Sequence, residues 1–255
     1  MFPARLGKSR FDPYYLLQTD PQNSRECKMS DKPVFSSQAD VLGAESAIST
    51  NKVLRNTYML LGMTLAFSAA TAGTSMAVGI SHMAGLVLML VGFGLLFVVN
   101  RMADTAKGLP AIFAFTGVMG AALGPMLNYY VSLPGGPSMI MQALGGTALV
   151  FFSLSAYALN TRKDFSYMGG FLITGLIVAI VASIANIFLG IPALSLTISA
   201  AIIMIMSGLI LFDTSRIING GETNYIRATV SLYLNIYNLF IHMLHLIGAF
   251  GGGDD

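Results

Sequence analysis

The sequence predicts an all-α polytopic membrane protein with seven transmembrane helices. Of the 255 residues, 55% are hydrophobic and only 10% are charged, whereas about 25% of a typical soluble domain is charged. Between Asn56 and Phe212 the chain holds six charged residues, in two short clusters. The rest of that stretch consists of apolar runs of membrane-spanning length, and these runs lack the alternation that is typical of a transmembrane β-barrel.

Seven apolar runs define the expected spans. Each has 18 to 25 residues, the length that crosses about 30 Å of hydrocarbon at about 1.5 Å per residue. The runs are Thr57 to Ile80, Met83 to Asn100, Pro110 to Val131, Met139 to Asn160, Phe165 to Leu189, Pro192 to Phe212, and Ala228 to Phe250. Turn-forming residues separate them, including "LPGGP" at 133–137 and "GIP" at 190–192.

The spans divide the chain into three segments. Residues 1–50 are predicted to form a flexible cytosolic N-terminal tail, because they are polar and rich in Ser, Pro, Asp and Gln. They contain no apolar segment typical of a signal peptide. Two further interpretations stay open: the tail binds a cytosolic partner, or Met29 is the true start and residues 1–28 are an upstream extension. Residues 51–250 form the seven-helix transmembrane domain, and 251–255 a short tail.

The basic residues set the expected orientation. All 14 Lys and Arg residues fall on one side of the seven-span arrangement: eight precede the first span, and two lie in each loop after the second, fourth and sixth spans. The positive-inside rule then puts the N-terminus in the cytoplasm and the C-terminus outside. We therefore expect a multi-pass membrane protein, in contact with lipids and without a nucleic-acid site.

Small residues are expected to let the spans pack closely, since lipid gives helices little hydrophobic reason to associate. Gly120 and Gly124 lie four residues apart in the third span. Pro125 is expected to kink that span, because it lacks an N–H and frees a carbonyl group one turn earlier. Asn128 is the predicted partner of that freed backbone. Further glycines of the fourth and fifth spans have the same expected packing role: Gly145, Gly146, Gly169, Gly170 and Gly175.

The last span carries a polar stripe. Its polar residues recur at intervals of 4, 3, 4 and 3 and therefore share one helical face: Ser231, Asn235, Asn238, His242 and His245. Polar groups facing hydrocarbon would lack partners, so this face is expected to point into the bundle or a wet cavity. The two histidines could ligate a metal, but no third ligand is evident, and Cys27 is the only cysteine. We expect hydrogen-bonded histidines, with no metal and no cofactor.

Asp213 is expected to lie beside the start of this stripe. It ends the sixth span, and a connection from Asp213 to Arg227 returns the chain to Ser231 and Asn235 in the first turns of the last span. Two interpretations remain open, an ordinary acid at a helix end and a pH-responsive interior acid. The candidate residues for pH sensing or an ion path are Asp213, Asn235, Ser231, Asn238, His242 and Arg216.

Three long stretches resemble the Bax inhibitor-1 (TMBIM) family, specifically its bacterial YccA-type branch. They are "KVLRNTYMLLGMTLAFSA" at 52–69, "ALGGTALVFFSLSAYAL" at 143–159 and "FDTSRIINGGETNYIRATVSLYLNIYNLF" at 212–240. The resemblance covers residues 51–250 and implies a seven-helix fold whose last helix is central. It also implies a choice between two functions. Members of the YccA-type branch are associated with the membrane protease FtsH, as modulator and substrate, and other members are pH-sensitive calcium leak channels.

The leak channels use two aspartates that share a proton, and only the first has a counterpart here. Asp213 matches it, but Asn235 occupies the second position. Two nearby acids can hold one proton between them, whereas an Asp and an Asn cannot. The first hypothesis is therefore an FtsH modulator, and the alternative is a calcium or proton leak along the polar stripe. An enzyme is not expected, because the sequence has no HExxH or GxSxG motif.

Overall fold

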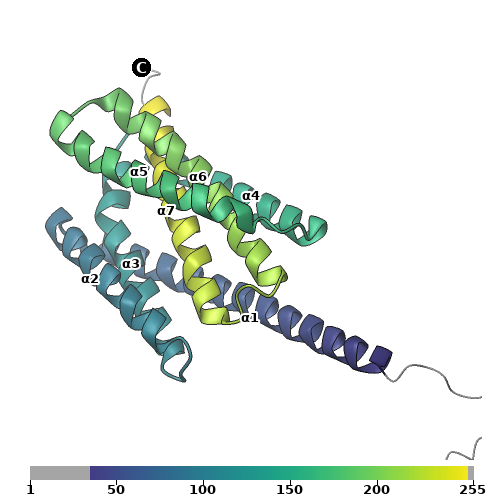
Figure 1. Ribbon diagram of the computed structural model, residues 1–255. Helices are drawn as coiled ribbons and strands as arrows, with labels where there is room; N and C mark the ends of the chain where they lie inside the picture. The colour runs from purple at the N-terminus through teal and green to yellow at the C-terminus, as the bar shows by residue number, and fades with distance from the viewer. Residues whose placement is uncertain (1–34, 252–255) are drawn as a thin grey trace, which may run out of the picture. The chain divides into compact units, whose positions relative to one another are not determined.

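The structure is a computed structural model that describes the backbone of residues 35–251 and the side chains from Thr50 to Gly251 (Figure 1). Every element in this part of the chain is helical. The elements are α1 (Phe35–Val78), α2 (His82–Met102), α3 (Gly108–Val131), α4 (Gly136–Thr161), the short 3₁₀ helix η1 (Ser166–Met168), α5 (Gly169–Leu189), α6 (Pro192–Ile218) and α7 (Tyr225–Gly251).

Seven helices in the described part of the chain are long and apolar enough to cross a membrane, which confirms the predicted number of spans. The sixth differs at its end, because α6 continues through Asp213 to Ile218, and only residues 219–224 connect it to α7. The prediction ended this span at its first charge. Asp213 is instead buried, 7% exposed, and its carboxylate accepts hydrogen bonds from α7. It therefore lies more than one turn before the helix ends.

The N-terminal part of α1 lies within the segment that the sequence assigns to a tail. α1 begins at Phe35, and residues 35–50 are free of proline and contain several good helix formers. The chain divides into two compact units, Met1–Gly43 and Ala44–Asp255, and the second contains all seven candidate spans. The predictions for residues 1–34, including the role of Met29, and for residues 252–255 lie outside the described residues.

Large apolar side chains cover the outside of the bundle. α5 is the least buried candidate span, with 11% of its most apolar window inside the protein, and α2 follows with 17%. Phe97 of α2 and Phe188 of α5 are 76% and 85% exposed. A soluble protein rarely exposes apolar surface on this scale, but a bilayer removes it from water. The chain is therefore an integral membrane protein.

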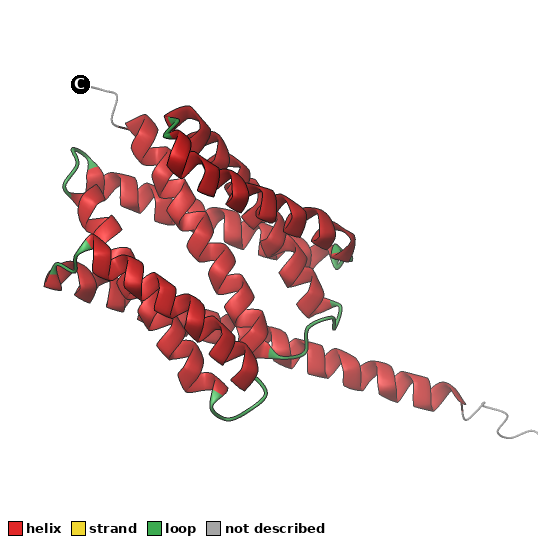
Figure 2. Ribbon diagram, turned by 60° about the vertical axis from the view of Figure 1, so that its left-hand side comes forward, coloured by secondary structure: helices red, strands yellow, loops and turns green. Residues whose placement is uncertain are grey.

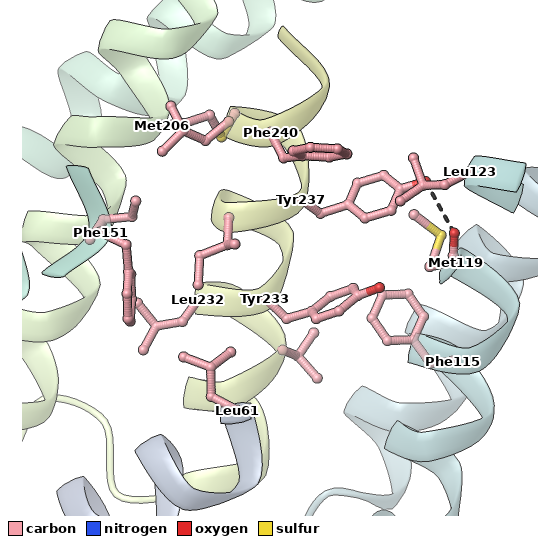
Figure 3. Packing of buried hydrophobic residues seen from close by; sticks show 14 of the residues in the cluster. Leu61, Phe115, Met119, Leu123, Phe151, Met206, Leu232, Tyr233, Tyr237 and Phe240 are labelled. Atoms are coloured by element: carbon pink, nitrogen blue, oxygen red, sulfur yellow. Dashed lines mark hydrogen bonds between the residues drawn. The ribbon is translucent and has the colours of Figure 1, made fainter. Parts of the chain in front are cut away.

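α7 runs through the middle of the bundle, between α1–α3 on one side and α4–α6 on the other (Figures 1 and 2). Its apolar side chains Leu232, Leu239 and Leu244 are fully buried. Tyr233 and Tyr237 reach across to α3 (Figure 3), where the Tyr237 hydroxyl donates to the carbonyl of Met119 at 3.3 Å. The Tyr233 hydroxyl is also 2.7 Å from Ser68 Oγ of α1. The central position expected for the last helix is confirmed.

α1 and α3 approach closely at two glycines, as predicted for Gly120 and Gly124. A Cβ atom at Gly120 would lie 2.7 Å from Ser68 Oγ, and one at Gly124 would lie 2.6 Å from Ser75 Cβ. Gly145 and Gly170 differ, because a Cβ at either would meet no atom within 4 Å; these two glycines do not mediate packing within the described chain.

The carbonyl group freed by Pro125 has a different partner from the one predicted. Pro125 lies inside α3, and its missing N–H leaves the carbonyl of Ala121 without an intrahelical donor. Ser75 Oγ of α1 donates to that oxygen at 2.7 Å. The predicted donor, Asn128, instead donates its side-chain amide to the carbonyl of Met76 at 3.1 Å. The prediction for Asn128 was wrong because the closest donor comes from a neighbouring helix.

Candidate functional site

Asp213 of α6 is held by two donors from α7. Ser231 Oγ and Asn235 Nδ2 both donate to Asp213 Oδ2, at 2.5 Å and 2.7 Å. The donors lie four residues apart on α7, so one helical face presents both. Asn235 is itself buried, 5% exposed. A buried acid needs such partners, since an isolated carboxyl group in an apolar interior is costly. The predicted proximity of Asp213 to Ser231 and Asn235 is found.

A cavity of about 620 Å³ adjoins this acid, and we call it the acid cavity. The polar stripe of α7 forms one wall, and apolar side chains of α2 and α5 form much of the opposite wall, including Phe93, Ile180 and Ile184. Its polar lining consists of Ser183, Asp213, Arg216, Ser231, Asn235, Asn238 and His242. All six residues predicted from the sequence therefore line one cavity, although their roles stay a prediction.

The contacts of Arg216 and Asn238 are local. Arg216 donates to the carbonyl of Gly221 at 3.3 Å and lies 3.8 Å from a carboxylate oxygen of Glu222. Its guanidinium carbon also lies 5.5 Å from the centre of the Phe212 ring. Asn238 donates to the carbonyl of Leu234, one turn earlier in its own helix. Neither side chain has a described hydrogen bond to Asp213.

The two histidines of the stripe meet at a serine that the sequence analysis did not single out. Ser199 Oγ of α6 is 3.1 Å from His242 Nδ1 and 2.8 Å from His245 Nδ1. These residues line a second cavity of about 290 Å³, which we call the histidine cavity. His242, Ser183 and Ile187 line both cavities, so the two adjoin. Ser199 was missed because only the packing of α6 against α7 brings it to the stripe.

The helix ends near Asp213 are joined by polar contacts between loops. Asn224 caps α7: its Oδ1 accepts from the backbone N–H of Ile226 at 2.8 Å. Its Nδ2 donates to the carbonyl of Ala103, after α2, at 2.9 Å. Arg227 also forms an ion pair with Asp104. The loop between α6 and α7 is therefore fixed to the loop between α2 and α3.

Asp213 lines two cavities of unequal size. The smaller, of about 20 Å³, is lined by Asp213, Arg216, Glu222, Arg227 and Ser231, among others. Asp213, Arg216 and Ser231 also line the acid cavity. The described residues contain no group of three or more His, Cys, Asp or Glu side chains that could hold a metal ion.

These features define a class, a seven-helix integral membrane protein whose central last helix carries a polar face onto a buried acid. The family model described as inhibitor of apoptosis-promoting Bax1 matches residues 50–252. The chain belongs to this family, the Bax inhibitor-1 family.

Two Escherichia coli relatives confirm the resemblance to the YccA-type branch. The strain K12 protein named "Modulator of FtsH protease YccA" is 56% identical over 204 residues, which cover 80% of this chain and 92% of that protein. The same values hold for "Inner membrane protein YccA" of strain O6:H1. A Vibrio cholerae relative, named "Uncharacterized membrane protein", is 52% identical over 211 residues, or 82% of this chain and 95% of that one.

Proposed function

We propose that this protein is an inner-membrane regulatory protein that modulates the membrane protease FtsH. The observation that carries the proposal is the 56% identity, over 80% of this chain, with the relative named as a modulator of that protease. The inner-membrane location follows from the name of the second Escherichia coli relative. In this role the protein acts by binding and is not itself an enzyme.

The proposed contact surface is the end of the bundle that carries the basic loops. Asn224 and the Arg227–Asp104 pair tie two of these loops together. Ser215 ties in the third, because its Oγ donates to the carbonyl of Lys163 at 3.0 Å and accepts from the N–H of Phe165 at 3.0 Å. Such fixed loops give a partner a surface of constant shape. Residues 1–49 precede the first span in the sequence, and in this role they provide a segment for a cytosolic partner.

This role requires the basic end to face the cytoplasm, with the C-terminus outside. Paired fusions at the C-terminus test the orientation. We expect alkaline phosphatase, which is active only outside, to be active, and a fluorescent protein that folds only in the cytoplasm to stay dark. The reverse pattern would contradict the topology and the contact surface together.

The protease role is tested by co-purification and by substrate turnover. We expect tagged full-length protein to retain FtsH in mild detergent, and deletion of the gene to accelerate FtsH-dependent degradation of membrane substrates. A variant that starts at Met29 tests whether the first 28 residues are needed to retain FtsH. Asp213→Asn, which alters the proposed ion path, is the control and should retain FtsH. Unchanged turnover after deletion, together with no retention of FtsH, would rule out the proposal.

The second candidate function is a pH-sensitive leak of calcium ions or protons. It is favoured by three adjoining cavities along α7. Asp213 lines both the small cavity at the basic end and the acid cavity, and His242 lines both the acid cavity and the histidine cavity. The α7 residues that line them extend from Arg227 to His245. Lipids surround the bundle in this role too, and calcium is the proposed ligand.

Flux into proteoliposomes at two pH values tests the leak. We expect flux above that of empty liposomes and a changed pH dependence in Asp213→Asn. The Asn235 amide nitrogen lies 2.7 Å from Asp213 Oδ2. Asn235→Asp therefore puts a second carboxyl group beside that of Asp213, and the two acids are expected to share one proton. Flux equal to that of empty liposomes in all three proteins would exclude this candidate.

A further inference from the structure

Ser199, His242 and His245 form a polar cluster that the protease role does not use, and the inference drawn from it deepens the proposed proton leak and rests on it. Ser199 is buried, 2% exposed, and its Oγ lies between the Nδ1 atoms of the two imidazoles, at 3.1 Å from His242 and 2.8 Å from His245. The serine comes from α6 and both histidines from α7. The cluster lies in the half of the bundle away from Asp213, beside the first turns of α6.

The hydrogen count at Ser199 fixes how protons are arranged in the cluster. A serine hydroxyl has one hydrogen to donate and lone pairs to accept with, whereas a neutral imidazole donates through one ring nitrogen and accepts through the other. If both Nδ1 atoms carried hydrogens, the buried Ser199 hydrogen would have no described acceptor, which is costly. One ring therefore donates from Nδ1 to Ser199, and Ser199 donates to Nδ1 of the other ring.

The surroundings of the pair are neutral. The residues that face it across the histidine cavity are Ser183 and Asn186 from α5, Ser195 from α6 and Met126 from α3, in addition to apolar neighbours. The two imidazoles are the only titratable groups in this described lining. The nearest charged groups on the adjoining lining are Asp213 and Arg216, in the acid cavity. A proton that enters this cavity therefore has the imidazoles as its binding groups.

We propose that Ser199, His242 and His245 form a proton-transfer site between the histidine cavity and the acid cavity. His245 lines the first cavity only, and His242 lines both. The His245 Nε2 lone pair takes up a proton, and His245 Nδ1–H passes its proton to Ser199 Oγ. Ser199 passes its own proton to His242 Nδ1, and His242 Nε2–H releases one into the acid cavity. One proton enters, one leaves, and the two rings exchange tautomers.

Nitrogen NMR on histidines tests the site directly. The chain has three histidines, so a ¹⁵N-histidine-labelled protein in nanodiscs is assigned with His242→Gln and His245→Gln, and His82 serves as an internal reference. Ring nitrogen shifts distinguish N–H from a bare lone pair. We expect His242 and His245 to have opposite tautomers, or signals averaged between them. As the pH falls, the first added proton should be shared between the two rings, so that both signals move in the same step.

Matched serine variants make the test specific to the relay. Ser199→Ala should uncouple the rings, giving two separate midpoints and loss of the opposite tautomers. Ser199→Thr keeps a hydroxyl and should keep the joint response, as should Ser195→Ala, which removes a hydroxyl from the same cavity. His82 is exposed at the start of α2, so an unchanged far-UV circular dichroism spectrum is the evidence that each variant is folded. Independent titration in the unaltered protein, or a Ser199→Ala spectrum equal to that of Ser195→Ala, would overturn the proposal while leaving the protease role untouched.

Discussion

The contact between Gly120 and α1 gives the sharpest test of how the bundle is held together. In Gly120→Ala the new Cβ would lie 2.7 Å from Ser68 Oγ and closer still to the Ser68 carbonyl oxygen. Because the obstacle is backbone, α1 must move away from α3 to relieve it. That movement also weakens the hydrogen bond from Ser75 to the carbonyl of Ala121. Gly145→Ala is the matched control, since its Cβ would meet no atom within 4 Å.

The two substitutions are expected to have opposite signs. Overpacking by one methyl group costs about 1–3 kcal/mol, and loss of one interhelical hydrogen bond in a membrane costs about 0.6 kcal/mol. Alanine regains about 1 kcal/mol over glycine in a helix interior. Gly120→Ala should therefore lower the free energy of unfolding by about 0.6–2.6 kcal/mol. In Gly145→Ala only the gain of alanine over glycine applies, so the free energy of unfolding should rise by about 1 kcal/mol.

Thermal unfolding of the purified protein in detergent measures the difference. A free-energy change of about 1 kcal/mol moves Tm by roughly 2–4 °C in a domain of this size, so the variants should fall on either side of the unaltered protein. A Tm for Gly120→Ala at or above that of Gly145→Ala would refute the reasoning, because it would mean that α1 and α3 do not touch at this glycine.

Three further substitutions or titrations test other contacts. Ser75→Ala removes the donor to the carbonyl freed by Pro125 and should cost about 0.6 kcal/mol in the same unfolding assay. Asn224→Ala removes the N-cap of α7 together with the donor to Ala103 and Asp104, and should lower the free energy of unfolding by about 1 kcal/mol or more. The backbone N–H of Ser166 donates to Asp164 at 2.8 Å, and hydrogen bonding from Ser166 lowers the pKa of the Asp164 carboxyl below its usual 3.8. Carboxyl NMR should find this lower pKa. Hydrogen bonding from Ser166 to the ionised carboxylate should stabilise the folded protein above pH 4 or so, and this stabilisation should be lost as the pH falls through the pKa of Asp164 in the folded protein.

The spans and the polar face of α7 are predictable from the sequence because they follow from local regularities. Membrane thickness sets the length of each apolar run, and the 3.6-residue helical repeat brings Ser231 and Asn235 to one side. The N-cap at Asn224 is also local, since its acceptor bonds the next turn of the same chain. Each of these features depends on residues within a few positions of one another.

Two contacts between helices could not be predicted from the sequence. Ser75 rather than Asn128 satisfies the carbonyl freed by Pro125, and Ser199 joins the two histidines. Both serines look like ordinary polar residues of apolar spans, and their partners lie more than 40 positions away. The predicted end of α6 is too early for a related reason. The apolar run stops at Asp213, but Ser231 and Asn235 of α7 donate hydrogen bonds to its carboxylate, and the helix can therefore continue past this charge.

The pairing of Asp213 with α7 has a consequence for how the chain is made. The ribosome synthesises α6 before α7, so an α6 that inserted alone would bring the acid into the membrane ahead of both of its donors. Until Ser231 and Asn235 arrive, insertion of α6 alone leaves a carboxyl group without its hydrogen bonds. The last two helices are thus expected to enter as a hairpin, and a nascent chain arrested before Tyr225 should turn over faster in a pulse-chase experiment than one arrested after Asn235.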